Sequence, residues 1–259
     1  MAIQLASKGS SVRQQVSPEE WQARVELAAG HRVLAHYGVN DLTYNHFGLR
    51  VPGEPDAMLI KRTDWMFTEV TASSLLKVDF DGNVLMDTDV RKIKGGALII
   101  HAGLLKGRPD LNATLHTHTV SGMGVAAHKF GLLPINQHAL GFYGIMKYHA
   151  FEGLEFDHDM TPKLIRDLDG GSVMILRNHG TLVCGGSVAE CVVDHHFLEM
   201  ACQGQIAALA AGEGNYTLPS KEACEYAFSQ ITRGGGTRGG KDWAACLRLA
   251  ERLDPFYKD

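Results

Sequence analysis

The chain has 259 residues, of which 45% are hydrophobic and 21% are charged, and its formal net charge at pH 7 is −4. This length and composition are typical of a soluble globular chain with one large domain. The small negative charge argues against nucleic acid or an anionic membrane surface as a partner, and no apolar run is long enough to span a bilayer. The five cysteines have no zinc-like spacing, which favours reduced thiols in a cytoplasmic protein: Cys184, Cys191, Cys202, Cys224 and Cys246.

The first third of the chain predicts one long helix followed by strands. Residues 1–16 lack the apolar core of a signal peptide and are predicted to form a flexible arm. Ser17-Pro18-Glu19-Glu20 is a capping box with proline at the first helical position, and it predicts a helix that ends near Gly38. The next predicted elements are strands over 42–51 and 57–61, a turn and short strand over 63–68, a helical turn at 72–75, and a hairpin over 77–85.

The rest of the chain alternates short strands with helices. Helices are predicted over 96–105, 120–129, 160–168, 188–211, 218–230 and 242–253. Strands are predicted over 112–115, 134–140, 144–149 and 171–176, with a hairpin over 177–186. This order favours a mainly antiparallel sheet with helices on both faces. The expected organisation is an arm at 1–16, a main domain at 17–230, and a glycine linker with a C-terminal helix at 231–259.

Three histidines suggest a metal site. His116 and His118 are two residues apart at a predicted strand, so both imidazoles can point to one face. His179 follows a second buried strand and precedes a glycine. Three imidazoles from fixed backbone can bind a divalent metal and leave a position open for substrate or water. An H-x-H pair alone could be a surface coincidence.

Several of these segments resemble the class II aldolase/adducin family. The similarity runs from about Ser17 to Gly212 and is carried by residues 108–113 leading into His116-Thr117-His118, by residues 177–180, and by the helix that follows. Residues 69–75 resemble the adducin-like branch. The resemblance implies a three-layer α/β/α sandwich, a homotetramer, and a divalent metal, usually zinc, held by the three histidines.

The chain departs from the family's sugar-phosphate aldolases at the catalytic positions. Ala97 stands where those enzymes have a glutamate, and Gly95 and Gly96 stand where they have two phosphate-binding serines. Their Gly-Asn pair corresponds to Asn45-His46, and of their Thr-Gly pair only Thr63 remains, followed by Asp64. A carboxylate at that position is expected to repel a phosphate. The sequence therefore predicts an enzyme that does not cleave phosphosugars.

Three functions stay open at this point. The first is a metal-dependent lyase, by retro-aldol cleavage or decarboxylation, acting on a small oxo- or hydroxy-carboxylate. The second is an iron-dependent oxygenase that cleaves C–C bonds at the same three histidines, since imidazoles suit zinc, iron and manganese alike. The third is a non-catalytic scaffold like adducin, which the presence of all three histidines disfavours.

Other polar residues complete the candidate site. His46, Asn45 and Thr63 are predicted to bind substrate, and His138 and Tyr143 are predicted catalytic residues. His101 is expected to pack behind the metal histidines, and Glu69 is a weaker candidate for the missing acid. For some other polar residues, a structural role explains their presence at least as well as a role in binding or catalysis. These residues are Arg62, Arg91, His195, His196, Tyr226 and Tyr257.

Overall fold

The computed structural model describes residues 9–86, 88–154, 159–233 and 240–259. The helices are α1 (Gly9–Gln15), α2 (Pro18–His36), α3 (Gly96–Gly107), α4 (Val120–Ala127), α5 (Gln137–Leu140), α6 (Met160–Leu168), α7 (Val188–Leu209), α8 (Lys221–Arg233) and α9 (Gly240–Leu253), with 3-10 turns η1 (Phe67–Glu69) and η2 (Pro255–Lys258). The strands are β1 (His46–Val51), β2 (Glu54–Ile60), β3 (Leu76–Asp79), β4 (Ala113–Thr117), β5 (Lys147–His149), β6 (Val173–Leu176) and β7 (Gly180–Gly185).

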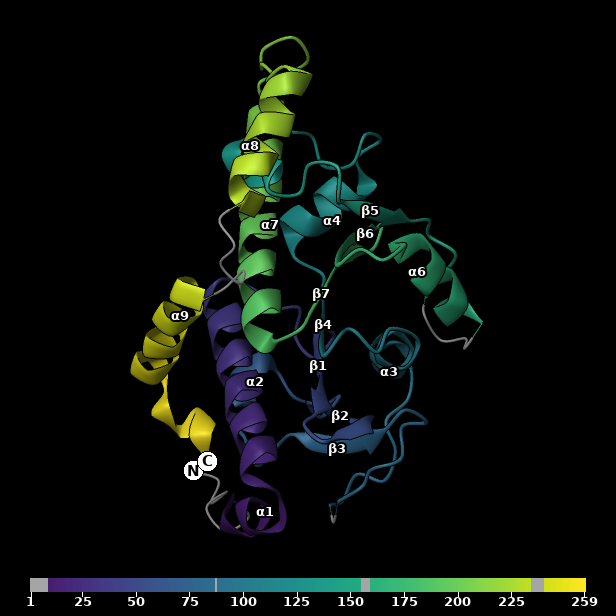
Figure 1. Ribbon diagram of the computed structural model, residues 1–259, viewed down its shortest axis with the longest axis vertical. Coiled ribbons are helices and arrows are strands. Elements are labelled where there is room, and N and C mark those ends of the chain that lie inside the picture. Colours follow the sequence, from purple (N-terminus) through teal and green to yellow (C-terminus); the bar gives the residue numbers. More distant parts are fainter. Residues whose placement is uncertain (1–8, 87, 155–158, 234–239) are drawn as a thin grey trace.

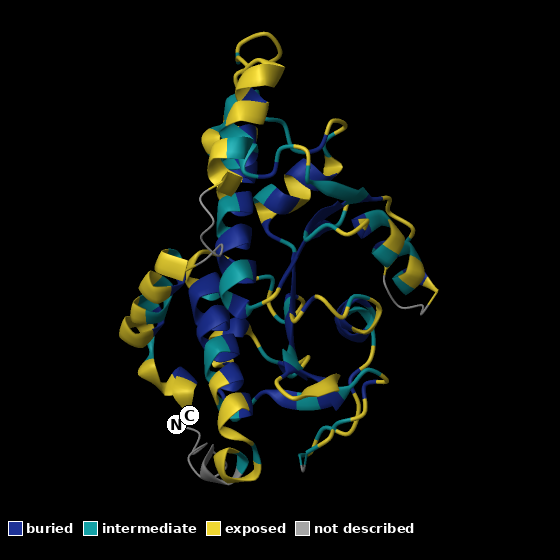
Figure 2. Cartoon of the chain, viewed as in Figure 1, coloured by how far each residue is buried: buried dark blue, intermediate teal, exposed yellow. Residues whose placement is uncertain are grey.

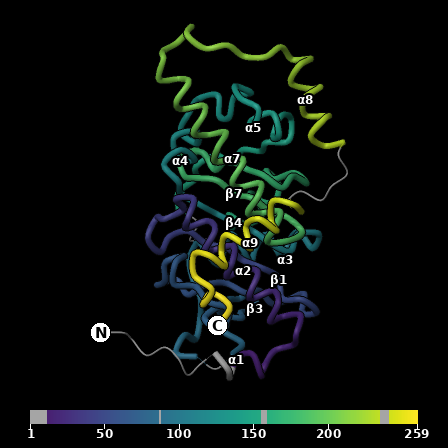
Figure 3. Tube along the Cα trace, turned by 90° about the vertical axis from the view of Figure 1, so that its left-hand side faces the viewer, coloured from purple at the N-terminus to yellow at the C-terminus, as the bar shows by residue number. Residues whose placement is uncertain are grey.

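The strands form one seven-stranded sheet in the order β3-β2-β1-β4-β7-β6-β5. Every neighbouring pair is antiparallel except β5 and β6, which are parallel. Helices α2, α7 and α9 lie on one side of the sheet, and α3 and α6 lie on the other (Figure 1). Figure 3 shows the first of these layers from its outer side, with α9 lying over α2. The chain therefore has the expected three-layer α/β/α architecture with a mainly antiparallel sheet.

Two hydrophobic cores follow from the alternation of side chains along the strands. In β2, Ala57 and Leu59 pack into the core under α2 and α7, whereas Met58 and Ile60 pack into the core under α3. Helices α2 and α7 are buried along much of their length because they are covered by the sheet on one side and by α9 on the other (Figure 2). Burial on both faces fixes the register of the central strands.

Most of the predicted elements are confirmed. The Ser17 hydroxyl accepts a hydrogen bond from the Glu20 backbone N–H at 3.1 Å, so α2 begins where the capping motif predicts. Helix α6 has the predicted bounds and ends at Asp169, whose φ of 44° is left-handed. Of the predicted strand over 144–149, β5 covers only the last three residues. None of the helices within the described ranges is both long and apolar enough to cross a membrane.

Two local predictions were wrong. Residues 134–140 were expected to form a strand, but the Asn136 side chain accepts a hydrogen bond from the Ala139 N–H at 2.9 Å and starts the short helix α5. The expected short strand over 63–68 is a turn followed by η1, which the Glu69 carboxylate caps through the Met66 N–H at 2.7 Å. Gly9–Gln15 forms the helix α1 within the predicted arm, and residues 1–8 and most of the predicted glycine linker lie outside the described residues.

Candidate metal centre

The three candidate histidines meet at one edge of the central sheet. His116 lies near the end of β4, directly opposite His46 of β1, and His118 follows the last residue of that strand. His179 lies in the tight turn between β6 and β7, which the His179 N–H closes by bonding the Leu176 carbonyl at 3.1 Å. Asn178 adopts the left-handed conformation that this turn needs, with φ of 57°. The sequence spacing therefore brings three imidazoles to one place, and we call them the histidine triad.

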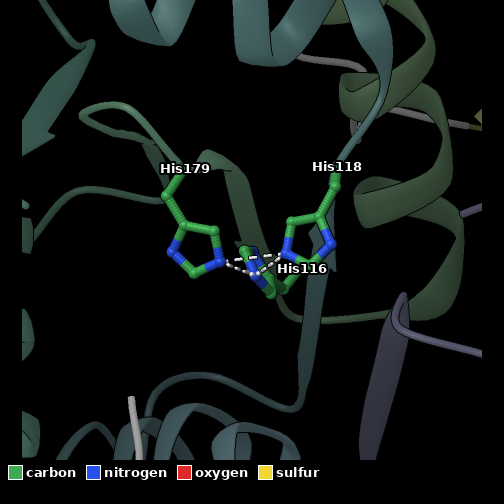
Figure 4. Close-up of side chains that lie close together, drawn as sticks. All are labelled: His116, His118 and His179. Atoms are coloured by element: carbon green, nitrogen blue, oxygen red, sulfur yellow. Dashed lines mark hydrogen bonds between the residues drawn. The ribbon is translucent and has the colours of Figure 1, made fainter. Parts of the chain in front are cut away.

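The Nε2 atoms of the triad converge on one point (Figure 4). The His116 and His118 Nε2 atoms are 2.8 Å apart, those of His118 and His179 are 2.9 Å apart, and those of His116 and His179 are 3.2 Å apart. His116 is buried, whereas His118 and His179 are partly exposed. The triad thus has a buried base and an open side.

The opposite ring nitrogens of two histidines are fixed by acceptors. His116 Nδ1 donates to the Thr181 carbonyl at 2.9 Å, and His118 Nδ1 lies 2.9 Å from the Asp41 carboxylate. Because a carbonyl and a carboxylate only accept, both Nδ1 atoms carry a proton, so in their neutral forms both rings direct an Nε2 lone pair at the other. Such an arrangement of acceptors is unfavourable unless a cation lies between them. The donor set therefore fits a divalent metal, with outer partners of the kind that orient metal-binding imidazoles.

The separations between the nitrogens allow one shared ion. All three Nε2 atoms lie within 3.2 Å of one another, so each could reach the same divalent ion at a metal–nitrogen distance of about 2.1 Å.

Burial favours the neutral form of His116 and His46. Desolvation holds the pKa of His116 well below its usual range, and the neighbouring His118 and His179 add to the effect. Desolvation also lowers the pKa of His46, and His101 and Lys61 contribute further. A metal ligand must be the neutral imidazole, so the low pKa of His116 favours metal binding at neutral pH.

His46 and His101 form a second tier behind His116. Since β1 and β4 pair at His46 and His116, both side chains face α3, and their ring centroids are 6.2 Å apart. The His101 ring of α3 lies 5.8 Å from His46, and its Nδ1 is 2.6 Å from the Thr114 hydroxyl. His101 therefore packs behind the triad as the sequence predicts, and burial lowers its pKa to about 3.

The other predicted substrate residues have different surroundings. Asn45 is buried, and its side-chain oxygen accepts the His118 N–H at 2.9 Å, so it positions the backbone of a triad member. Thr63 is exposed in a turn between Arg62 and Asp64. Arg62 holds both oxygens of Asp64 at 3.1 Å and also bonds Asp89, and its hydrogen bond lowers the pKa of Asp64. The Asp64 charge, which we expected to repel phosphate, is therefore compensated.

The two predicted catalytic residues lie elsewhere. The His138 ring stacks on Phe197 of α7 at 5.2 Å, and Tyr143 is half-buried in the turn after α5. Within the described residues, no hydrogen bond or ring contact joins either side chain to the triad, so their catalytic role stays a prediction. Of the two C-terminal tyrosines, Tyr257 is buried in the core and Tyr226 is exposed.

Sequence reasoning missed two residues at this edge. Asp41 lies in the loop before β1 and bonds His118. Phe151, half exposed in the loop after β5, places its ring edge-on to His179 with centroids 6.4 Å apart. The need of a metal-binding histidine for a carboxylate or carbonyl partner could have drawn attention to Asp41. No pattern in the sequence indicates Phe151.

The fold and the triad define a class of protein: an α/β/α sandwich with a candidate metal centre at the edge of its sheet. Residues 25–206 match the profile described as "Class II Aldolase and Adducin N-terminal domain". The chain belongs to the class II aldolase and adducin family.

Three relatives illustrate this membership. A Caulobacter vibrioides protein named "Putative aldolase class 2 protein" is 39% identical over 249 residues, which cover 96% of each chain. The crystal structure of an aldolase II superfamily protein from Pseudomonas syringae has a TM-score of 0.92 at 42% identity, covering 96% of this chain and 100% of that one. Alpha-adducin from Rattus norvegicus is 34% identical over 220 residues, which cover 84% of this chain but 30% of adducin.

Proposed function

We propose that this protein is a metal-dependent lyase that acts on a small oxo- or hydroxy-carboxylate by retro-aldol cleavage or decarboxylation. The observation that carries the proposal is the convergence of three Nε2 atoms, two of them on rings whose Nδ1 atoms are fixed by Thr181 and Asp41. Family membership supports aldolase-type chemistry. We expect zinc as the metal, with iron or manganese as the other candidates.

When bound, a divalent ion would act as a Lewis acid on the oxygen atoms of a carbonyl or carboxylate. His116, His118 and His179 would hold the ion, and Asp41 and the Thr181 carbonyl would keep two of the rings in the required tautomer. His46 faces the same side of the sheet as His116, so its imidazole can hydrogen-bond a substrate oxygen beside the triad. Phe151 provides an apolar surface next to His179.

Phosphosugars are not the expected substrates. Ala97, at the position of the family's glutamate, is buried and packs in the core under α3, so it offers no acid or base. Gly95 has φ of 77° and ψ of −160°, a conformation essentially restricted to glycine, where the aldolases would have a serine. Both features support a substrate whose anionic group is a carboxylate rather than a phosphate.

An iron-dependent oxygenase is the second candidate. It is supported by the three imidazole donors, because imidazole ligands suit iron as well as zinc. A non-catalytic scaffold is the third candidate, and the similarity to adducin supports it. We favour an enzyme because the triad is complete.

We also expect a cytoplasmic homotetramer without nucleic-acid or membrane partners. Exposed apolar side chains on α4 and α7 support burial of this surface between subunits: Val120, Met123 and Ile206. Light scattering combined with size-exclusion chromatography measures the number of subunits directly.

The test of the proposed function is the metal content of protein purified without a histidine tag, compared with a His116→Ala/His118→Ala double variant. We expect about one metal ion per wild-type chain and none in the double variant. A His36→Ala variant, which changes a histidine on α2, is the matched control. Oxygen consumption during turnover separates the two enzymes, since only an oxygenase consumes it. If the wild-type protein bound no metal even after reconstitution, both enzyme candidates would be excluded and the non-catalytic scaffold would remain.

A further inference from the structure

A pocket between α2 and α7 lies on the opposite side of β4 from the triad. Its cavity volume is about 130 Å³. Aliphatic side chains of α2 and α7 line one part of it, including Val33, Leu34 and Val192. The pocket is close in size to an engineered cavity of about 150 Å³ that holds benzene, so a ligand of about five or six non-hydrogen atoms fits.

Two of the residues that line this pocket, His195 and Glu199, are polar and buried, and we call them its floor. His195 and Glu199 of α7 line it, although their side chains are 2% and 7% exposed. Glu199 accepts a hydrogen bond from the Thr119 hydroxyl at 2.5 Å, another from Ser121, and a longer one from Gln203 at 3.4 Å. Desolvation raises the pKa of Glu199, because a carboxylate in this position has lost most of its water.

The charge and the walls of the pocket favour a cation. Among the described residues that line it there is no lysine or arginine, and the only carboxylate is Glu199. Burial lowers the pKa of His195 to about 4 and also lowers the pKa of His196, so both rings are neutral at pH 7. The Tyr37 and His196 rings, which lie 4.5 Å apart, and the Met200 side chain also line the pocket. A carboxylate together with aromatic rings is typical of sites for organic ammonium ions.

The floor is also connected to the triad through the sheet. On β4, Thr117 lies between His116 and His118, and its hydroxyl is 2.8 Å from His195 Nε2 and 3.0 Å from the Thr181 hydroxyl. Thr181 is the residue whose carbonyl accepts the His116 Nδ1 proton. Thr119, which bonds Glu199, directly follows His118. Both polar groups of the floor therefore touch a residue adjacent to a triad histidine.

We propose that the pocket between α2 and α7 binds a small organic ammonium ion through Glu199, Tyr37 and His196, and that its occupancy changes the metal affinity of the triad. Ammonium binding places a positive charge beside the buried Glu199 carboxylate, in addition to the hydroxyl and amide donors that already bond it. This charge acts on the residues next to the triad through two hydrogen bonds, that of Glu199 with Thr119 beside His118 and that of His195 with Thr117 beside His116. Coupling of this kind is reciprocal, so metal binding changes the ammonium affinity by the same factor.

The first test measures binding to metal-free protein by NMR titration with two probes of equal size, tetramethylammonium and tert-butyl alcohol. We expect the ammonium ion to bind about tenfold more tightly than the neutral alcohol. The Tyr37→Ala and Glu199→Gln variants should lose about tenfold in ammonium affinity, Tyr37→Phe should retain it, and Tyr226→Ala on exposed α8 is the control. Equal affinities for the two probes would overturn the assignment of an ammonium ligand. If Tyr37→Ala bound the ammonium ion as tightly as the wild type, the assignment of the site to this pocket would be overturned. Tyr37 is exposed, so this variant keeps the test valid even if Glu199→Gln does not fold.

The second test measures the zinc dissociation constant with and without saturating tetramethylammonium. We expect a change of about fivefold or more in the wild type and none in Tyr37→Ala. An unchanged constant in the wild type would overturn the coupling between the two sites. Because the first test uses metal-free protein, a triad that binds no metal would refute the proposed function and leave the ammonium site standing.

Discussion

Asp41 offers the sharpest test of the metal centre, because its carboxylate directly contacts a histidine of the triad. Its carboxylate lies 2.9 Å from His118 Nδ1. We expect Asp41→Ala to weaken metal binding, since His118 then loses the acceptor that fixes its tautomer and orientation and that makes Nε2 a better donor to a metal. The backbone at His118 stays anchored, because the Asn45 side chain still bonds its N–H.

The size of the effect follows from the exposure of the pair. A hydrogen bond to a charged group contributes about 1.5–3 kcal/mol when it is well shielded. The side chain of Asp41 is 43% exposed, so water replaces part of the interaction in the variant. We therefore expect a loss of about 1–2 kcal/mol, which is about a five- to thirtyfold rise in the metal dissociation constant. Asp41→Asn keeps an acceptor without the charge and should lie between the wild type and Asp41→Ala.

The assay is competition for zinc against a chromophoric chelator at low ionic strength. Asp56→Asn is the matched control, because Asp56 is exposed at the far end of the β1–β2 hairpin. Thermal unfolding of the metal-free variants should match the wild type to within about 0.5 kcal/mol, as is usual for a change at a partly exposed position. An Asp41→Ala protein with wild-type zinc affinity would refute the idea that this contact organises the triad.

Three further outcomes follow from the surroundings of the site. Asn45→Ala should destabilise the metal-free protein by about 1–3 kcal/mol, measured by urea unfolding, because the partly buried His118 N–H loses its acceptor. His31 is fully buried with its pKa lowered to about 3, so between that value and 6.5 the unfolded chain binds more protons and stability falls on acidification. Protonation of His31 in the unfolded chain lowers the free energy of unfolding by about 1.4 kcal/mol for each pH unit below 6.5. In urea unfolding from pH 7 to 5, the free energy of unfolding of His31→Phe should therefore depend less steeply on pH than that of the wild type. Gly95→Ser should cost about 1–3 kcal/mol in thermal unfolding, and neither it nor the wild type should cleave L-fuculose 1-phosphate in a coupled assay.

The triad could be predicted from the sequence because each of its parts is local. His116 and His118 are close because of strand periodicity, and His179 is placed by a tight turn after a buried strand. In the sheet, β7 lies between β4 and β6 and pairs with both, so the turn that carries His179 comes beside the end of β4 that carries His116. Local rules gave the individual elements, and the family resemblance gave the arrangement that brings them together.

The partners of the triad were missed because they depend on tertiary contacts. Asp41 is 77 residues before His118, in a loop without regular structure. Likewise, Thr117 meets His195 across 78 residues, when α7 packs on the sheet. At residues 134–140 the error was of another kind, because the cap at Asn136 selected a short helix where the apolar pattern favoured a strand.

The arrangement of protons at the triad bears on the choice between an enzyme and a scaffold. A structural cluster of histidines gains stability when each ring nitrogen meets a complementary partner. In their neutral forms, His116 and His118 each donate their single proton to an outward acceptor, Thr181 or Asp41, and direct acceptor nitrogens toward each other at 2.8 Å. The same backbone could bury leucine at position 116 without that repulsion, so the triad is a poor way to stabilise a sheet edge. The triad is well suited to hold a cation. For this reason the similarity to adducin supports a shared fold more strongly than a shared role as a scaffold.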